Sequence, residues 1–229
     1  MNKAIIKLGL ASVLSISASA STLPHSAGQI FVFSQSDIKT DIKNFLDKNS
    51  EYVTGTCSNT GIESLKIVNI QSTDIIHEIL TELGEKSWIN TLKSLYITNS
   101  KLKETVQVLA NVLIRLPQLQ ILNLENNKLK SAEIKVLVRA LPYLSQLRTL
   151  DLSNNWITEA GAQALAGVLP ELPQLQTLDL KENLIENVGT RMLVYALPAQ
   201  LQSLDLRDNH IITAVAQELK DRVNIELRI

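Results

Sequence analysis

Apolar and polar residues follow one short pattern that recurs along the chain. In LRTLDLSNNWI, from Leu147 to Ile157, leucines at the first, fourth and sixth positions precede an asparagine and a further apolar residue. Alternation with a period of two predicts a β-strand. Copies that begin 30, 27, 28, 28 and 26 residues apart start at Ile62, Leu92, Leu119, Leu147, Leu175 and Leu201. This near-constant spacing indicates a structural repeat.

The second half of each repeat has apolar residues four apart. Gly161, Leu165 and Leu169 show this spacing, and equivalent positions recur in the neighbouring copies. A four-residue spacing places side chains on one face of a helix. Proline cannot continue a helix, and Leu–Pro pairs close four of the predicted helices at 116–117, 141–142, 169–170 and 197–198. Each repeat is therefore predicted to be a strand, a turn and a helix.

One such repeat cannot bury its own leucines, whereas stacked repeats share a core. The strands are then expected to form a parallel sheet with the helices behind it. Four repeats carry an asparagine after the strand, at Asn127, Asn155, Asn183 and Asn209. These side chains should stack as a ladder, because an amide both donates to and accepts from backbone groups. Ser100 can do part of this and Ile70 cannot, so the first repeat is expected to be irregular.

The LxxLxLxxNxL cores and Gly-x-x-x-Leu-x-x-x-Leu helices, clearest from Leu119 to Val223, resemble leucine-rich-repeat proteins. The subtype that they resemble has ~28 residues per repeat and occurs in ribonuclease inhibitor and NOD-like receptors. The resemblance covers residues 62–229 and implies an α/β fold, a leucine-rich-repeat solenoid with a concave parallel sheet and convex helices. Its anchors are structural in every member and imply no particular partner. Ribonuclease inhibitor is long and rich in cysteine, unlike this chain, so ribonuclease binding is not carried over.

Residues 1–20 have the order of a secretory signal peptide. Lys3 and Lys7 precede an apolar stretch from Leu8, and Ala18-Ser19-Ala20 forms a cleavage pattern. Cleavage before Ser21 would direct the chain to the periplasm or outside the cell; the alternative is an apolar first helix of the domain. The lysine-bearing leader and the absence of Asn-x-Ser/Thr sites favour a bacterial source. A short bacterial chain of this type resembles the secreted repeat proteins that intracellular pathogens use as effectors, and as virulence factors, on host targets.

The ends of the stack require caps. Residues 21–61 are predicted to form an N-terminal capping segment. It contains an amphipathic helix over residues 36–48, a strand at 30–33 and a loop over 52–61. Residues 62–229 hold the repeats and end in NIELRI, whose alternation predicts a C-terminal capping strand.

The sequence contains no recognisable catalytic or metal-binding set. His25, His77 and His210 lie far apart, and Cys57 has no basic neighbour or nearby histidine. An inert thiol is therefore expected, and neither an enzyme nor a cofactor is predicted. The net charge of −1 and the 4% of aromatic residues give no indication of nucleic-acid binding.

We predict instead a non-catalytic module that binds a protein partner, possibly from a host, on its concave face. The residues expected on this surface occupy strand positions or the turns that follow: Tyr96, Asn123, Glu125, Asp151, Ser153, Trp156, Asp179, Lys181, Leu184, Asp205 and Arg207. The alternatives are a structural protein of the periplasm or envelope and, third, a hydrolase or ligase.

Two features of this surface leave alternatives open. Asp151, Asp179 and Asp205 share one strand position, so they either bind a cation or basic partner or are solvated and paired, with Lys181 and Arg207 nearby. The slot after the ladder position varies between repeats, as Lys101, Lys128, Trp156, Leu184 and His210. Tryptophan is enriched at interface hot spots, so Trp156 either forms a binding patch with Leu184 or packs over the helix edge.

Overall fold

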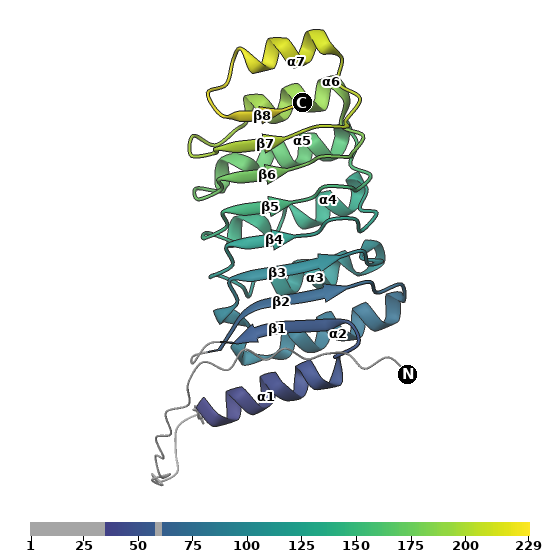
Figure 1. The fold of residues 1–229 in the computed structure, drawn as a ribbon, viewed down its shortest axis with the longest axis vertical. Coiled ribbons are helices and arrows are strands. Elements are labelled where there is room, and N and C mark those ends of the chain that lie inside the picture. Colours follow the sequence, from purple (N-terminus) through teal and green to yellow (C-terminus); the bar gives the residue numbers. More distant parts are fainter. Residues whose placement is uncertain (1–34, 58–60) are drawn as a thin grey trace.

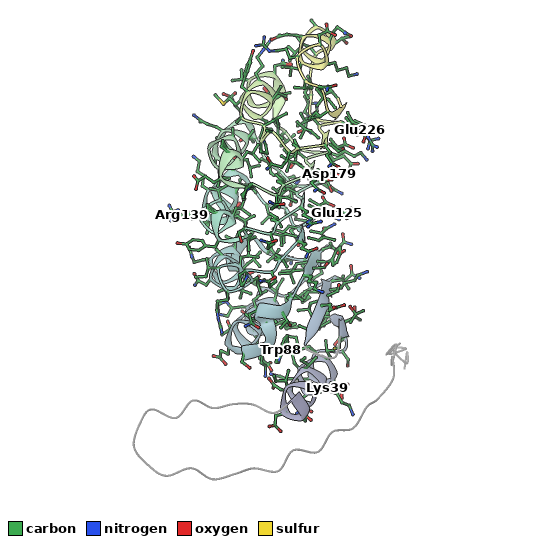
Figure 2. The ribbon with its side chains drawn as sticks, turned by 90° about the vertical axis from the view of Figure 1, so that its left-hand side faces the viewer. Lys39, Trp88, Glu125, Arg139, Asp179 and Glu226 are labelled. Atoms are coloured by element: carbon green, nitrogen blue, oxygen red, sulfur yellow. The ribbon has the colours of Figure 1, made fainter. Side chains whose placement is uncertain are left out.

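The computed structural model describes residues 35–57 and 61–229, which form a stack of strand–helix repeats. The strands lie side by side in chain order along the long axis, and the helices form a second layer behind them (Figure 1). Seen from the side, the sheet and the helices occupy opposite faces of the molecule (Figure 2). The signal peptide and the strand predicted at 30–33 lie outside the described residues.

The described strands belong to one eight-stranded sheet. Their bounds are β1 (Val53–Cys57), β2 (Ile62–Val68), β3 (Ser94–Thr98), β4 (Ile121–Asn123), β5 (Thr149–Asp151), β6 (Thr177–Asp179), β7 (Ser203–Asp205) and β8 (Glu226–Arg228). The α-helices are α1 (Gln35–Lys48), α2 (Thr73–Glu85), α3 (Val106–Leu113), α4 (Ser131–Leu137), α5 (Glu159–Val168), α6 (Glu186–Tyr195) and α7 (Thr213–Lys220). Short 3₁₀ turns are η1 (Ser87–Thr91), η2 (Lys103–Thr105), η3 (Leu141–Tyr143) and η4 (Leu169–Glu171).

The leucines of the repeat pattern build the core between the two layers. In the fourth repeat Leu147, Leu150, Leu152 and Ile157 are all at most 1% exposed. From β2 to β8 the strands pair in parallel, and the repeat positions stay in register across the sheet. Each repeat therefore contributes the same apolar positions to one continuous core, as the sequence pattern predicts.

The predicted asparagine ladder is present, and Asn155 shows how it works. Its Oδ1 accepts from the backbone N–H groups of Asn127 (3.1 Å) and Leu129 (2.9 Å). Its Nδ2 donates to the carbonyl oxygens of Leu124 and Leu152, each at 3.0 Å. One side chain thus satisfies backbone groups of its own turn and of the preceding repeat.

The ladder weakens toward the N-terminal end. Ser100 takes the asparagine position there, and its Oγ accepts from the N–H of Ile70 at 3.1 Å and donates to the carbonyl of Thr98 at 3.0 Å. Ile70 itself is fully buried and supplies no side-chain hydrogen bond. The ladder contact between the first and second repeats is therefore a single hydroxyl, although β2 and β3 remain paired in parallel over five residues.

Helix α1 covers the N-terminal end of the stack. Ile42 and Phe45 are buried, and the Phe45 ring meets the buried Trp88 ring edge to face with centroids 5.6 Å apart. The Asp41 carboxylate accepts from Trp88 Nε1 and from Lys86 Nζ, both at 2.9 Å. This contact between α1 and η1 closes the apolar end of the first repeat, which confirms the predicted capping helix.

The loop predicted over 52–61 is wrong for its first half. Residues 53–57 form β1, which pairs antiparallel with β2. The glycine and polar residues suggested a loop, but valine and threonine favour strands, and Val53 is buried. Gly55 also allows α1 to approach, because a Cβ there would lie 3.2 Å from a methyl group of Leu46. The edge of the parallel sheet is thus covered by a strand as well as a helix.

The C-terminal strand forms as predicted. β8 pairs in parallel with β7, and Ile225, Leu227 and Ile229 are partly buried against the core. Glu226 and Arg228 alternate with them and are exposed, and Arg228 Nη2 lies 2.6 Å from Glu226 Oε1.

Gly189 allows two neighbouring repeats to pack closely. A Cβ at this position would lie 2.8 Å from Ile185 Cγ2 and 3.0 Å from Ala162 Cβ. We expect Gly189→Ala to lower the free energy of unfolding by ~1–3 kcal/mol, because overpacking forces a shift between α5 and α6. Gly167→Ala is the matched control, since nothing lies within 4 Å of a Cβ there. Alanine is a better helix former than glycine by ~1 kcal/mol. Urea denaturation should therefore show a lower free energy of unfolding for Gly189→Ala and a higher one for Gly167→Ala.

Candidate protein-binding surface

The first of two exposed regions is the sheet face, whose outward-pointing side chains do not pack into the core. Glu125, Asp179 and Glu226 lie on this side of the molecule, and Arg139 lies on the opposite, helical side (Figure 2). Residues between the buried leucines of each strand point away from the core. Among them, Thr149 and Asp151 of β5 are partly exposed around the buried Leu150.

One column of side chains crosses the sheet face in register. Asn123, Asp151, Asp179 and Asp205 are direct neighbours on β4 to β7, and Arg228 follows on β8. Neighbouring strands lie ~4.8 Å apart, so three consecutive carboxylates are closely stacked. We call Asp151, Asp179 and Asp205 the carboxylate column.

The two outer carboxylates of the column have side-chain partners. Asp151 accepts from Asn123 Nδ2 at 2.7 Å and from the Ser153 hydroxyl at 2.6 Å. Asp205 is only 5% exposed and accepts from Arg207 Nε at 3.0 Å. Burial tends to raise the pKa of Asp205, but its hydrogen bonds to Arg207 and the charges of Arg207 and Arg228 outweigh this and lower the pKa. The charged form of Asp205 therefore stabilises the fold above the unfolded pKa of ~3.9, and this contribution is lost as pH falls through the lower folded value.

In the described part of the chain, the middle carboxylate, Asp179, has no side-chain hydrogen bond, and Arg207 acts on it only through its charge. Its Oδ1 accepts from the backbone N–H of Lys181 at 2.9 Å. Lys181 Nζ instead lies 2.6 Å from Glu182 Oε1. Burial raises the pKa of Asp179, and the negative charges of Asp151 and Asp205 add to this effect. Asp151 and Asp205 at the ends of the carboxylate column thus have side-chain partners, whereas Asp179 at its centre is repelled by both.

We expect Asp179→Asn to stabilise the protein at pH 7. An asparagine keeps an oxygen for the Lys181 N–H and removes a charge between two carboxylates, where like charges on adjacent strands cost ~0.2–1 kcal/mol. A raised folded pKa means that ionised Asp179 costs stability above that pKa. The cost disappears below the unfolded value of ~3.9. Melting curves should therefore show a gain at pH 7 that vanishes near pH 3; a gain that persists there would contradict the charge explanation.

The other residues predicted on the sheet face differ in exposure. Glu125 is exposed, and Tyr96 is partly exposed with Lys66 Nζ 5.2 Å from its ring centre. Ser153 and Asp205 are buried, so their side chains serve the fold rather than the surface. Arg207 is exposed, but its guanidinium is hydrogen-bonded to the Asp205 carboxylate.

The second exposed region is the turn between each strand and its helix, where Trp156 lies. Trp156 is 45% exposed and Leu184, in the same slot of the next repeat, is 41% exposed. The Trp156 ring centre lies 5.6 Å from Lys130 Nζ and 6.0 Å from Lys128 Nζ. The Trp156 ring thus lies near two lysine ammonium groups, while almost half of its surface meets solvent.

A shallow depression beside Trp156 joins these residues. It is lined by Lys130, Ser131, Ala132, Trp156, Thr158 and Leu184. Trp156 and Leu184 donate backbone hydrogen bonds of 2.8 Å to the preceding repeat, which holds the turns in contact. Sequence reasoning found Trp156 and Leu184 but missed Lys130 and the 57% exposed Ile212. The sequence does contain a signal for Lys130 and Ile212, because the third residue after the ladder position varies between repeats, as the first does.

The described residues contain no group of three or more His, Cys, Asp or Glu side chains that could hold a metal ion. Cys57 on β1 is exposed, and partial desolvation of its thiol raises the pKa, which disfavours the nucleophilic thiolate. In the same part of the chain, no helix is long and apolar enough to cross a membrane.

The repeated strand–turn–helix units, the asparagine ladder and the parallel sheet define an α/β leucine-rich-repeat solenoid. Residues 145–191 match the family model described as leucine-rich repeats in two copies. Leucine-rich-repeat proteins generally mediate protein–protein interactions.

The solved structures that are similar to this chain include two with known names. The actin-binding site 2 of leiomodin-1 is 14% identical, with a TM-score of 0.48, over 65% of this chain and 87% of that one. An internalin from Listeria monocytogenes str. 4b F2365 is 18% identical, with a TM-score of 0.26, over 70% of this chain and 64% of that one. No curated protein matches the sequence.

Proposed function

We propose that the protein is a non-catalytic binding module that holds a protein partner on its sheet face and on the turns around Trp156. The main observation is that these two regions carry exposed residues that differ from repeat to repeat, whereas the core positions repeat. A rigid surface with mixed polar residues and a half-exposed tryptophan suits protein recognition.

The proposal is tested by affinity capture with the full chain and surface variants. Glu125→Lys changes the sheet face and Trp156→Ala changes the turns. Lys135→Glu and Arg139→Glu change the exposed helical side as controls. Arg207→Glu is unsuitable, because it would place a second carboxylate beside the buried Asp205. Variants with unchanged melting temperatures are compared by quantitative mass spectrometry.

The expected result is a partner that the wild-type chain and the helical-side variants retain and that the first two variants lose. Trp156→Ala should weaken that complex by ≥2 kcal/mol if it is a hot spot. A partner lost only with the helical-side variants would place the interface on the opposite face. Capture of no protein would favour a structural role in the periplasm or envelope.

We further propose that the chain is exported and acts outside the bacterial cytoplasm, on a host protein. The support is the order of charged, apolar and small residues in the first twenty positions. Mass spectrometry of the exported protein should give a chain that begins at Ser21. An intact Met1 terminus would contradict cleavage.

A further inference from the structure

The turns of the solenoid form one continuous edge with two different halves. Its positions are the first and third residues after the ladder position in the second to sixth repeats. These residues are Lys101, Lys103, Lys128, Lys130, Trp156, Thr158, Leu184, Glu186, His210 and Ile212. All of them are exposed, and we call this set the turn edge.

The N-terminal half of the turn edge is basic. Lys101, Lys103, Lys128 and Lys130 occupy all four of its positions. Ion pairs in the described residues involve other lysines, and these four ammonium groups have no carboxylate partner there. Two acids lie close in sequence, of which Glu104 is exposed and Glu133 accepts a 2.8 Å hydrogen bond from the Lys130 backbone N–H. The half retains an excess of positive charge.

The C-terminal half carries three apolar side chains among its six positions, and the other three are Thr158, Glu186 and His210. Trp156, Leu184 and Ile212 are each between 41% and 57% exposed. The depression beside Trp156 is lined by residues of both halves, with Lys130 on one side and Leu184 on the other. The basic and apolar halves therefore meet at Trp156, whose ring already contacts two of the lysines.

The spacing of the edge fits an extended chain. Parallel β-bridges join Lys130 to Trp156 and Thr158 to Leu184, so adjacent turns are held at strand spacing. At ~4.8 Å per repeat, the four steps from Lys101 to His210 span ~19 Å, which an extended peptide covers with about six residues. An acidic run would lie beside the unpaired lysines, and apolar residues would cover Trp156, Leu184 and Ile212.

We propose that the turn edge binds an extended protein segment in which a run of acidic residues is joined to a run of apolar residues. This deepens the proposed function and rests on it, because it names the chemistry of the segment that the Trp156 region would bind. Nucleic acid and anionic membranes would also meet the lysines. A protein segment is favoured because the same edge continues into the exposed Trp156, Leu184 and Ile212, which apolar side chains would cover and a phosphate backbone would not.

The test measures fluorescence anisotropy of labelled seven-residue peptides with the full chain. Each peptide joins four glutamates to three leucines, one in each order; control peptides replace the glutamates by lysine or the leucines by serine. We expect one order to bind, and both control peptides to bind at least ~10-fold more weakly. Binding should weaken when salt is raised from ~0.05 to ~0.3 M, because exposed charges are screened.

Surface variants assign the binding to the edge. Lys128→Glu with Lys130→Glu, and separately Trp156→Ala, should each weaken the active peptide at least ~10-fold. The charge-matched control on the helical side, Lys135→Glu with Arg139→Glu, should change it less than ~2-fold. Melting curves must show that all variants are folded. If the double charge reversal Lys128→Glu with Lys130→Glu unfolds the chain, the milder pair Lys128→Gln with Lys130→Gln replaces it.

Three outcomes would overturn the inference. These are no binding by either peptide order, an equal loss with the helical-side pair, or vesicles of phosphatidylserine that bind with the same dependence on the edge residues. A captured partner that is lost with Glu125→Lys while neither peptide binds would refute this inference and leave the proposed function standing. Failure of both capture and peptide binding would refute both.

Discussion

Asn155→Leu should lower the free energy of unfolding by ~3 kcal/mol or more. The Asn155 side chain is 3% exposed. It accepts hydrogen bonds from two backbone N–H groups and donates to the carbonyl oxygens of Leu124 and Leu152. Leucine has a similar size but leaves these buried groups without partners. Each unsatisfied buried group costs ~1–3 kcal/mol, and some of this cost is relieved by shifts in the turn. Urea denaturation followed by circular dichroism measures the loss.

The neighbouring residue supplies the control. Asn154 is exposed but has a φ of 52°, a left-handed conformation that asparagine and glycine tolerate. Asn154→Leu would add ~1–2 kcal/mol of backbone strain, more than an exposed position suggests. Asn154→Gly avoids the strain and should change stability by less than ~1 kcal/mol. Similar losses for Asn155→Leu and Asn154→Gly would contradict the structural role of the ladder.

Trp88→Ala should also cost ~3–5 kcal/mol, the range for removing a large buried aromatic side chain. Trp88 is 3% exposed and contacts Phe45 of the capping helix. Its Nε1 also donates to Asp41, which would be left with Lys86 as a partner. Loss of this ring should loosen α1 from the first repeat, so amide exchange in residues 35–57 should accelerate before the rest of the chain.

Trp156→Ala is the natural comparison, because Trp156 is the other tryptophan of the chain. Its half-exposed ring contacts lysine chains on the turn edge rather than the core. We expect its loss to cost less than ~1.5 kcal/mol of stability. A larger loss for Trp156→Ala than for Trp88→Ala would mean that Trp156 is a packing residue, and the turn edge would lose its proposed hot spot.

The repeat pattern predicts the fold almost completely. Leu150, Asn155 and their equivalents occupy positions where the fold accepts few residue types, so the pattern is visible without structural information. β1 was missed because its strand signal, valine and threonine, is short and contains Gly55. Its pairing with β2 depends on a tertiary contact that local preference does not encode.

The candidate surface was predicted less well. Alternation places Asp205 and Ser153 on the sheet face, but it cannot show that Arg207 covers Asp205 or that Ser153 turns its hydroxyl onto Asp151. How far a strand residue is exposed depends on side chains that lie two residues along the chain or one repeat away from it. The left-handed backbone of Asn154 was equally hidden, because exposed loops give no sequence signal for φ beyond the asparagine itself.

The asparagine ladder also determines how the solenoid should come apart. Each ladder amide connects its own turn to the preceding repeat, so opening one repeat deprives its neighbour of hydrogen-bond partners. In a one-dimensional array, such nearest-neighbour coupling makes the units melt together. The ladder's own contribution is smallest between Ile70 and Ser100, where one hydroxyl replaces the amide, and there the longer pairing of β2 with β3 joins the repeats instead. Mild denaturant should therefore open the ladder turns from Asn127 to Asn209 as one block.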